Sequence, residues 1–477
     1  MTSTIPARAG AAADAAAGKP ALRRTLTTPR IVFLVVAAAA PMSGVVGSVP
    51  LAYAIGNGAG VPATFALAGL ILLCFSVGYA AMSRHVVGAG GFYTYIGQGL
   101  GRPPAVAGVA GAFGYFAELV CAAHHLTVPW PVWTGAALAL TAVMGYRRID
   151  LSARLLAVLM VAEVAVLGLL ALAIGVRHGA DTLPVASLRP DTVFSPGLGV
   201  ALMFALISYV GFEAAALYGE ESRDPKRSVP VATYASVVLI TVFFAGISWA
   251  AVGAIGADRV ADRAGTELGD LFFHLSDEYL GTFATSVMQV LLCTSLFGAL
   301  LGLHTAANRY LFVLGRERVL PVSLARIHPR HASPHRASVV LSVATAVVCA
   351  LFALAGAHPY TNLATTMLAL GTVGIVGLQA AVAVAVLVFF RRHPDAHWWR
   401  TRLAPALALA GLLGALALLL ANFPLVTGTT SAWVNRIPWL MVAAALGGLG
   451  YAGWLRARAP ERYRAVATAA QDIPPLP

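Results

Sequence analysis

Long apolar runs recur along almost the whole chain and constrain its fold more than any other feature. A helix needs roughly 20 apolar residues to cross the hydrocarbon core of a bilayer. Only 11% of the residues are charged, whereas soluble domains average about 25%, so lipid is the solvent that fits. Windows of the required size predict twelve transmembrane helices, at 31–55, 63–83, 104–126, 130–146, 153–174, 198–219, 229–255, 281–305, 337–356, 362–390, 403–423 and 433–455.

The lysines and arginines predict how these helices are oriented. With the N-terminus in the cytoplasm, 27 of the 32 Lys and Arg residues fall in the two tails and in every second loop. Positively charged loops resist translocation, so we expect a multi-pass protein of the cytoplasmic (inner) membrane with both termini inside. Residues 1–28 are expected to form a disordered cytoplasmic tail, and residues 457–477 a second tail. The basic residues form no patch interleaved with aromatics, so nucleic acid is not an expected partner.

Several kinds of chemistry have no counterpart in the sequence. The four cysteines lie in apolar runs without paired spacing, which favours small buried side chains over disulfides or metal ligands. There is no phosphate-binding Gly-Lys-Ser/Thr loop and no zinc-type spacing of His, Glu and Cys. We therefore predict a protein that is not an enzyme, has no cofactor and no metal, and does not draw its energy from ATP.

Two of the predicted helices carry helix-breaking residues near mid-length. The first contains Pro41, Met42, Ser43 and Gly44, and the sixth contains Ser208, Tyr209, Val210, Gly211 and Phe212. Proline removes a backbone donor, and glycine frees the backbone. Such residues also mark kinks or close helix packing. However, interrupted helices at corresponding places in two halves of a chain are the best sequence indication of a transporter binding site.

The broken helices suggest how a solute would be held. The N-terminal end of a half-helix offers free N–H groups to an anion such as a carboxylate. We expect a carboxylate near Ser43 and Gly44, and an amino group near the carbonyls of 208–211. Tyr209 and Phe212 are candidates to cover the bound molecule.

Four stretches carry a family resemblance. They are Pro41-Met42-Ser43-Gly44, the 79–102 segment with Gly88-Ala89-Gly90-Gly91, the 211–230 segment with Gly211-Phe212-Glu213, and the 308–321 segment with Gly315-Arg316-Glu317. Together they resemble the amino acid–polyamine–organocation (APC) superfamily of permeases. Helix 1 departs from the family pattern, with Pro-Met where a first glycine is common.

The resemblance implies an all-α transporter whose core has five helices plus five in an inverted repeat, with helices 1 and 6 discontinuous. The repeats would span 29–175 and 198–392. Helices 11 and 12, at 400–456, would lie outside them and serve packing or homodimer contacts. The resemblance also implies alternating access, with an amino acid or a related amine as the small-molecule substrate.

Three acids lie inside predicted spans, where a charged acid costs roughly 2.5–3.5 kcal/mol. By resemblance, Glu163 in helix 5 faces helices 1 and 8. Sodium-coupled relatives hold an ion there, and proton-coupled relatives can carry a titratable side chain. Thr294 and Ser295 would complete either site. Glu163 is thus the first candidate for proton coupling, with a buried glutamate that serves packing as the structural alternative.

The remaining polar candidates are less specific. By resemblance, Glu213 helps to hold the broken backbone of helix 6 and binds a proton, or it is a purely structural cap. Glu118 is a candidate for the solute path, or else the partner of a nearby group. His124 and His125 are expected to be solvated at the outer face. The function we predict is secondary active transport of an amino acid or amine, coupled to protons; exchange, sodium symport and, more remotely, a non-transporting solute sensor stay open.

Overall fold

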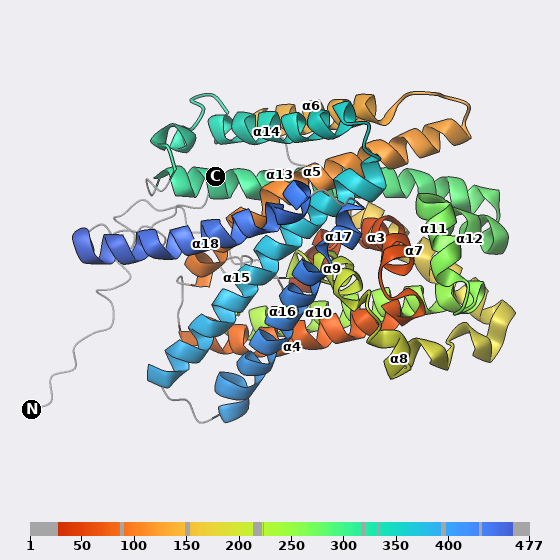
Figure 1. Ribbon diagram of the computed structural model, residues 1–477, viewed down its shortest axis with the longest axis horizontal. Helices are drawn as coiled ribbons and strands as arrows, with labels where there is room; N and C mark the ends of the chain where they lie inside the picture. Colours follow the sequence, from red (N-terminus) through yellow and green to blue (C-terminus); the bar gives the residue numbers. More distant parts are fainter. Residues whose placement is uncertain are drawn as a thin grey trace, which may run out of the picture.

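The computed structural model describes residues 27–85, 90–147, 153–212, 222, 224–316, 320–331, 333–392, 397–428 and 432–460. These residues form a bundle of long helices joined by short ones (Figure 1). The long helices are α2 Thr28–Ala38, α3 Pro41–Ile55, α4 Val61–His85, α5 Gly90–Ala123, α6 Trp130–Arg147, α7 Ala153–His178, α9 Leu198–Ser208, α10 Pro225–Ile255, α13 Thr282–Arg316, α14 His335–Leu354, α15 Thr365–Arg392, α16 Ala404–Ala421 and α18 Ala432–Arg458.

Short elements connect them. They are η2 Gly58–Gly60, η3 Gly179–Thr182, η4 Val185–Leu188, α8 Pro190–Val193, α11 Val260–Glu267, η6 Leu268–Asp270, α12 Leu271–Leu280, η7 Val322–Ala325, the π-helical turns η8 Pro359–Ala364 and η9 Trp399–Leu403, and α17 Phe423–Thr427. Within the described ranges, eight helices are long and apolar enough to cross a membrane, and α3 and α9 are shorter apolar helices.

Many large apolar side chains lie on the outer face of the bundle. On α7, Leu169, Leu172 and Val176 are 55%, 62% and 81% exposed. A soluble protein rarely leaves such a continuous apolar face open to water, and a helix that is apolar on all sides is typical of a membrane span. The helices therefore bury one face in protein and present the other to lipid.

The short helices α3 and α9 occupy the middle of the bundle. They pack on each other, while α4, α10, α13, α15 and α16 surround them. At one edge, α6 and α14 run side by side (Figure 1). This arrangement encloses the two interrupted segments on several sides, so polar groups freed at their ends must find partners inside the protein.

Candidate functional site

The first membrane segment is broken, as its sequence predicted. Helix α2 ends at Ala38, and α3 begins at Pro41. Between them Ala40 adopts the left-handed conformation, with φ +45°, which costs a residue other than glycine roughly 1–2 kcal/mol. Proline is well suited to the first position of a helix because the N–H that it lacks would have no helical partner there. The break thus lies just before the predicted Pro41–Gly44 motif, and that motif forms the first turn of α3.

Glu163 of α7 caps this new helix start from the side. Its Oε2 accepts a hydrogen bond from the backbone N–H of Met42 at 3.1 Å. The same oxygen accepts a second bond, also 3.1 Å, from the hydroxyl of Ser295 on α13. The side chain is only 4% exposed. Glu163 thereby joins α7, α13 and the break before α3 at one atom.

The first turn of α3 has one further backbone N–H group that could bind a ligand. Pro41 has no N–H, and the N–H of Gly44 bonds to the carbonyl of Ala40 at 3.1 Å. Within the described chain, the N–H of Ser43 has no acceptor. Unpaired N–H groups at a helix start are suited to binding an anion.

The sixth segment is interrupted in a similar way. Helix α9 ends at Ser208, and Gly211 then takes a φ of +119°, a conformation that only glycine adopts readily. The two breaks are neighbours, because a Cβ at Gly44 would lie 3.6 Å from the Ser208 hydroxyl. That Cβ would also come within 2.5 Å of the Phe244 ring, so any larger residue at position 44 would require this buried ring to move. Glu213 lies outside the described residues.

The aromatic side chains of this second break, Tyr209 and Phe212, contact α4 and α10. The Tyr209 hydroxyl donates to the carbonyl of Phe65 at 2.9 Å and lies 2.9 Å from the Thr241 hydroxyl. Phe212 is buried, with its ring edge-to-face against Phe75 at 6.2 Å. Their predicted role as covers of a bound solute remains a prediction, as does the role of Val210.

Two further candidates have local partners. The Thr294 hydroxyl donates to the carbonyl of Leu291 within α13 at 2.9 Å, whereas Ser295 contacts Glu163. On α5, the carboxylate of Glu118 accepts the N–H of Trp130 at 3.0 Å. Glu118 therefore caps the start of α6, and its place on the solute path stays a prediction. His124 and His125 are exposed just beyond the end of α5.

An aromatic cover over α3 was missed by the sequence analysis. The Tyr360 hydroxyl of η8 donates to the carbonyl of Gly47 at 3.1 Å. The Tyr115 ring stacks on Tyr360 with centroids 4.8 Å apart, and Phe116 packs edge-on against it at 5.3 Å. These contacts join α5, η8 and α3 about two turns beyond the break. No local sequence pattern could reveal them, because their members lie in distant parts of the chain.

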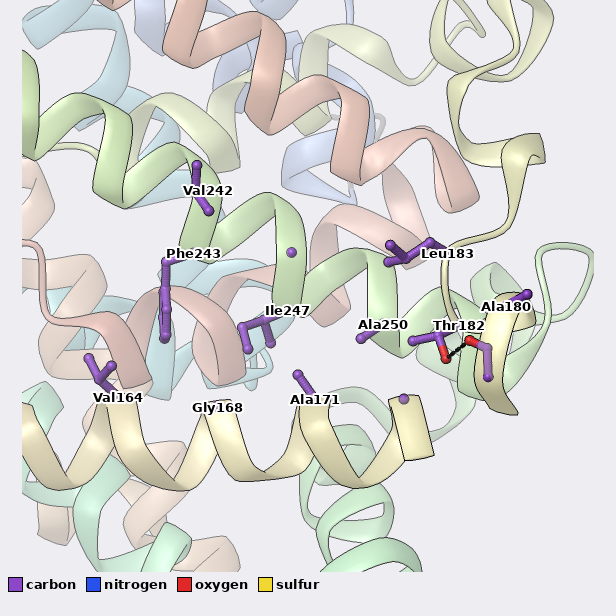
Figure 2. A pocket seen from close by; sticks show the side chains of 13 residues that line it. Val164, Gly168, Ala171, Ala180, Thr182, Leu183, Val242, Phe243, Ile247 and Ala250 are labelled. Atoms are coloured by element: carbon purple, nitrogen blue, oxygen red, sulfur yellow. Dashed lines mark hydrogen bonds between the residues drawn. The ribbon is translucent and has the colours of Figure 1, made fainter. Parts of the chain in front are cut away.

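A separate apolar groove lies on another side of α7 (Figure 2). It has a volume of about 570 Å³ and runs between α7 and α10, from Val164 to Thr182 and Leu183. Figure 2 shows Val164, Gly168 and Ala171 on α7 facing Phe243 and Ile247 on α10. The Thr182 hydroxyl is already bonded to the carbonyl of Gly179 at 2.8 Å. The groove thus lacks the polar groups that an amino acid needs, and the helix breaks are the better candidate site.

Comparisons with known proteins show what the whole chain resembles. Over 323 residues the chain is 28% identical to an uncharacterised transporter of Mycobacterium tuberculosis, covering 66% of this chain and 70% of the relative. It is 26% identical to the chloroplastic cationic amino acid transporter 7 of Arabidopsis thaliana, covering 70% and 60% respectively. The crystal structure of MhsT in complex with L-phenylalanine shares the fold, with a TM-score of 0.53 at 16% identity, over 82% of this chain and 99% of that one.

These relatives are transporters rather than enzymes, and the apolar helices make this chain a multi-pass membrane protein. The match to a family as a whole is more extensive than any of these single likenesses. The model of the amino acid permease family matches residues 26–446, so this chain belongs to that family, within the APC superfamily.

Proposed function

We propose that this permease carries an amino acid or a related amine across the membrane by alternating access, and that a proton bound at Glu163 drives it. The observation that carries the proposal is the pair of hydrogen bonds from Met42 and Ser295 to one oxygen of a buried carboxylate. A buried carboxylate is costly unless it is paired or protonated, so this site favours a group that changes its charge during the cycle.

The geometry suggests how a proton would act. Hydrogen bonds to a charged acceptor are roughly twice as strong as neutral ones. Protonation of Glu163 would weaken the bonds that hold α7 to α3 and α13. The start of α3, with its unpaired Ser43 N–H, would then shift relative to α7. One binding event would thus change the state of the helix that receives the solute's carboxylate.

The available energy is sufficient for accumulation. One charge that crosses 100 mV yields roughly 2.3 kcal/mol, which corresponds to about fifty-fold concentration of a solute. Twelve spans, two inverted repeats of five helices and cytoplasmic termini belong to this proposal. They are supported by the long helices, α2–α7, α9, α10, α13–α16 and α18, which overlap the predicted windows, and by the charge asymmetry of the loops.

The test is uptake into proteoliposomes with imposed gradients. Radiolabelled amino acids and polyamines would be screened under three conditions. The first has an inward proton gradient, the second an inward sodium gradient, and the third no ion gradient but unlabelled solute inside the vesicles. We expect concentrative uptake only with the proton gradient. Uptake that follows sodium alone, or that requires internal solute, would replace proton coupling by sodium symport or exchange, and binding without any uptake would indicate a sensor.

A further inference from the structure

A cluster of cationic and titratable side chains gathers where α6 ends and α14 begins. The rings of His328, His331 and His335 surround Tyr146, at centroid distances of 5.2, 6.0 and 5.9 Å. His328 is also 4.7 Å from His331 and 5.2 Å from His335. The proposed transport cycle uses none of these residues. The excess of Lys and Arg in cytoplasmic loops does not account for three imidazole rings around one tyrosine.

The loop that carries two of these histidines is held in a defined shape. The Ser333 hydroxyl donates to the carbonyl of Tyr146 at 2.6 Å, and the N–H of His328 donates to the carbonyl of Ser333 at 2.9 Å. The Nδ1 of His328 accepts the N–H groups of Arg330 and His331, both at 3.2 Å. A neutral imidazole that accepts at Nδ1 carries its proton on Nε2, so His328 keeps one N–H donor for another partner.

Four arginines add permanent positive charge to the cluster. All are exposed: Arg147 ends α6, Arg326 and Arg330 lie in the loop, and Arg336 is the second residue of α14. No carboxylate of a described residue forms an ion pair with any of them. Partial burial and the charges of His328, Arg330 and Arg147 lower the pKa of His331. A neighbouring anion would be attracted to this cluster.

The position of the cluster indicates which anion. Helix α6 has 18 residues, or about 27 Å at 1.5 Å per residue, so its Arg147 end lies near the headgroup layer of a bilayer. Both helices lie at the edge of the bundle (Figure 1). Their exposed apolar residues continue from the cluster along the helices: Leu140 and Val143 on α6, and Val340 and Val343 on α14, are 47–57% exposed.

We propose that the cluster around Tyr146 binds the phosphate of an anionic phospholipid, whose acyl chains lie on the exposed apolar face of α6 and α14. The arginines supply fixed charge, His328 supplies its Nε2 N–H, and His331 and His335 take up protons as the phosphate approaches. Binding therefore strengthens as the pH falls through the range in which imidazoles titrate. Among the described residues, His304 on α13 also lies nearby, 3.0 Å from a Cβ added at Gly145, but it is buried and hydrogen-bonded to Ser342 and Asn308.

The experiment measures binding to the full-length protein in detergent. Native mass spectrometry would count bound phosphatidylglycerol, phosphatidylcholine with the same chains, and inorganic phosphate, at about pH 6 and about pH 8. We expect a defined phosphatidylglycerol adduct that is several-fold tighter at the lower pH. Each basic residue near an anionic surface contributes roughly fivefold in affinity, so Arg147→Gln with Arg330→Gln should weaken the adduct at least tenfold.

Matched variants separate the site from general surface charge. Arg400→Gln with Arg402→Gln removes two exposed arginines of η9 instead, and it should retain the adduct. Arg147→Lys with Arg330→Lys should largely restore it, which guards against misfolding, and His331→Gln should remove most of the pH dependence. Equal losses in both glutamine pairs, or binding of phosphatidylcholine or of free phosphate as strong as that of phosphatidylglycerol, would overturn the proposal.

Discussion

Glu163 and Glu118 do the same chemical task at two depths of the bundle. Each carboxylate accepts a backbone N–H at the start of a neighbouring helix, from Met42 in α3 and from Trp130 in α6. Glu163 is 4% exposed and serves a helix start created by a break inside a membrane segment. Glu118 is partly exposed and serves a helix that begins after a loop. In this structure the cap at Trp130 borders solvent, where water could replace it, whereas the cap at Met42 is enclosed by protein.

The difference teaches that the surroundings, rather than the contact, decide what a capping glutamate does. At the end of a loop, the N–H of Trp130 can find water if Glu118 is lost. At the break before α3, the N–H of Met42 would be left unpaired in an apolar interior, at a cost of about 1–3 kcal/mol. In the proposed mechanism it is therefore the deep carboxylate, Glu163, whose change of charge alters the position of a helix.

Replacement of the two glutamates is the strongest test of this contrast. We expect Glu163→Gln to lower proton-driven uptake by at least tenfold, because an amide cannot take up a proton, while exchange or solute binding stays measurable. Glu118→Gln, the matched control, should keep more than half of the uptake. Initial rates in proteoliposomes with an imposed proton gradient provide the measurement. Similar losses in both variants would mean that depth does not distinguish them.

Ser295→Ala sharpens the comparison at the deep site alone. It removes one of the two donors to the carboxylate, and hydrogen bonds to charged groups contribute about 1.5–3 kcal/mol. The charged form of Glu163 should become less favourable. We expect the pH profile of uptake to move upward by about one unit, with the maximal rate reduced less than in Glu163→Gln. The neighbouring Thr294→Val, which breaks only a bond within α13, should leave the profile unchanged.

The two glutamine variants should differ less in their free energy of unfolding than in their rate of uptake. In Glu118→Gln the amide oxygen still accepts from Trp130, but the favourable charge at the start of α6 is lost, so we expect a cost of about 0.3–1 kcal/mol. Unfolding of the detergent-solubilised protein, followed by tryptophan fluorescence, would measure it. A destabilisation larger than that of Glu163→Gln would contradict the assignment of Glu118 to an exposed, replaceable cap.

The smallest effect concerns Asp270, an acid outside the membrane segments. Burial raises its pKa, the charge of His274 opposes this, and Glu267 adds to it. An acid whose pKa is raised in the folded state makes folding less favourable as the pH rises from its unfolded value through its folded one. Asp270→Asn should therefore stabilise the protein slightly at pH 7, with no gain below about pH 4. An equal gain in stability at pH 7 and below about pH 4 would exclude the titration of Asp270 as its cause.

The sequence identified the breaks well because they are local. Pro41 and Gly211 change the backbone at their own positions, and the structure interrupts the helices next to both. Glu163 and Ser295 could be paired only through a family resemblance, and the Met42 donor was not foreseen, because its release depends on where α2 ends. Tyr115 with Tyr360, and the histidines around Tyr146, were not foreseen either, since only tertiary packing unites them.

The order of residues on α7 has a mechanical consequence. Glu163 faces α3 and α13, while its neighbour Val164 lines the apolar groove beside α10. Successive helical residues are about 100° apart, so a twist of α7 by a single position would move the carboxylate towards hydrocarbon. Twisting is thereby penalised, whereas leaning into the groove is not opposed at Gly168, where nothing lies within 4 Å of an added Cβ. In the proposed mechanism, the weakening of the two hydrogen bonds to Glu163 would therefore favour a tilt of α7 towards α10 over a rotation about its axis.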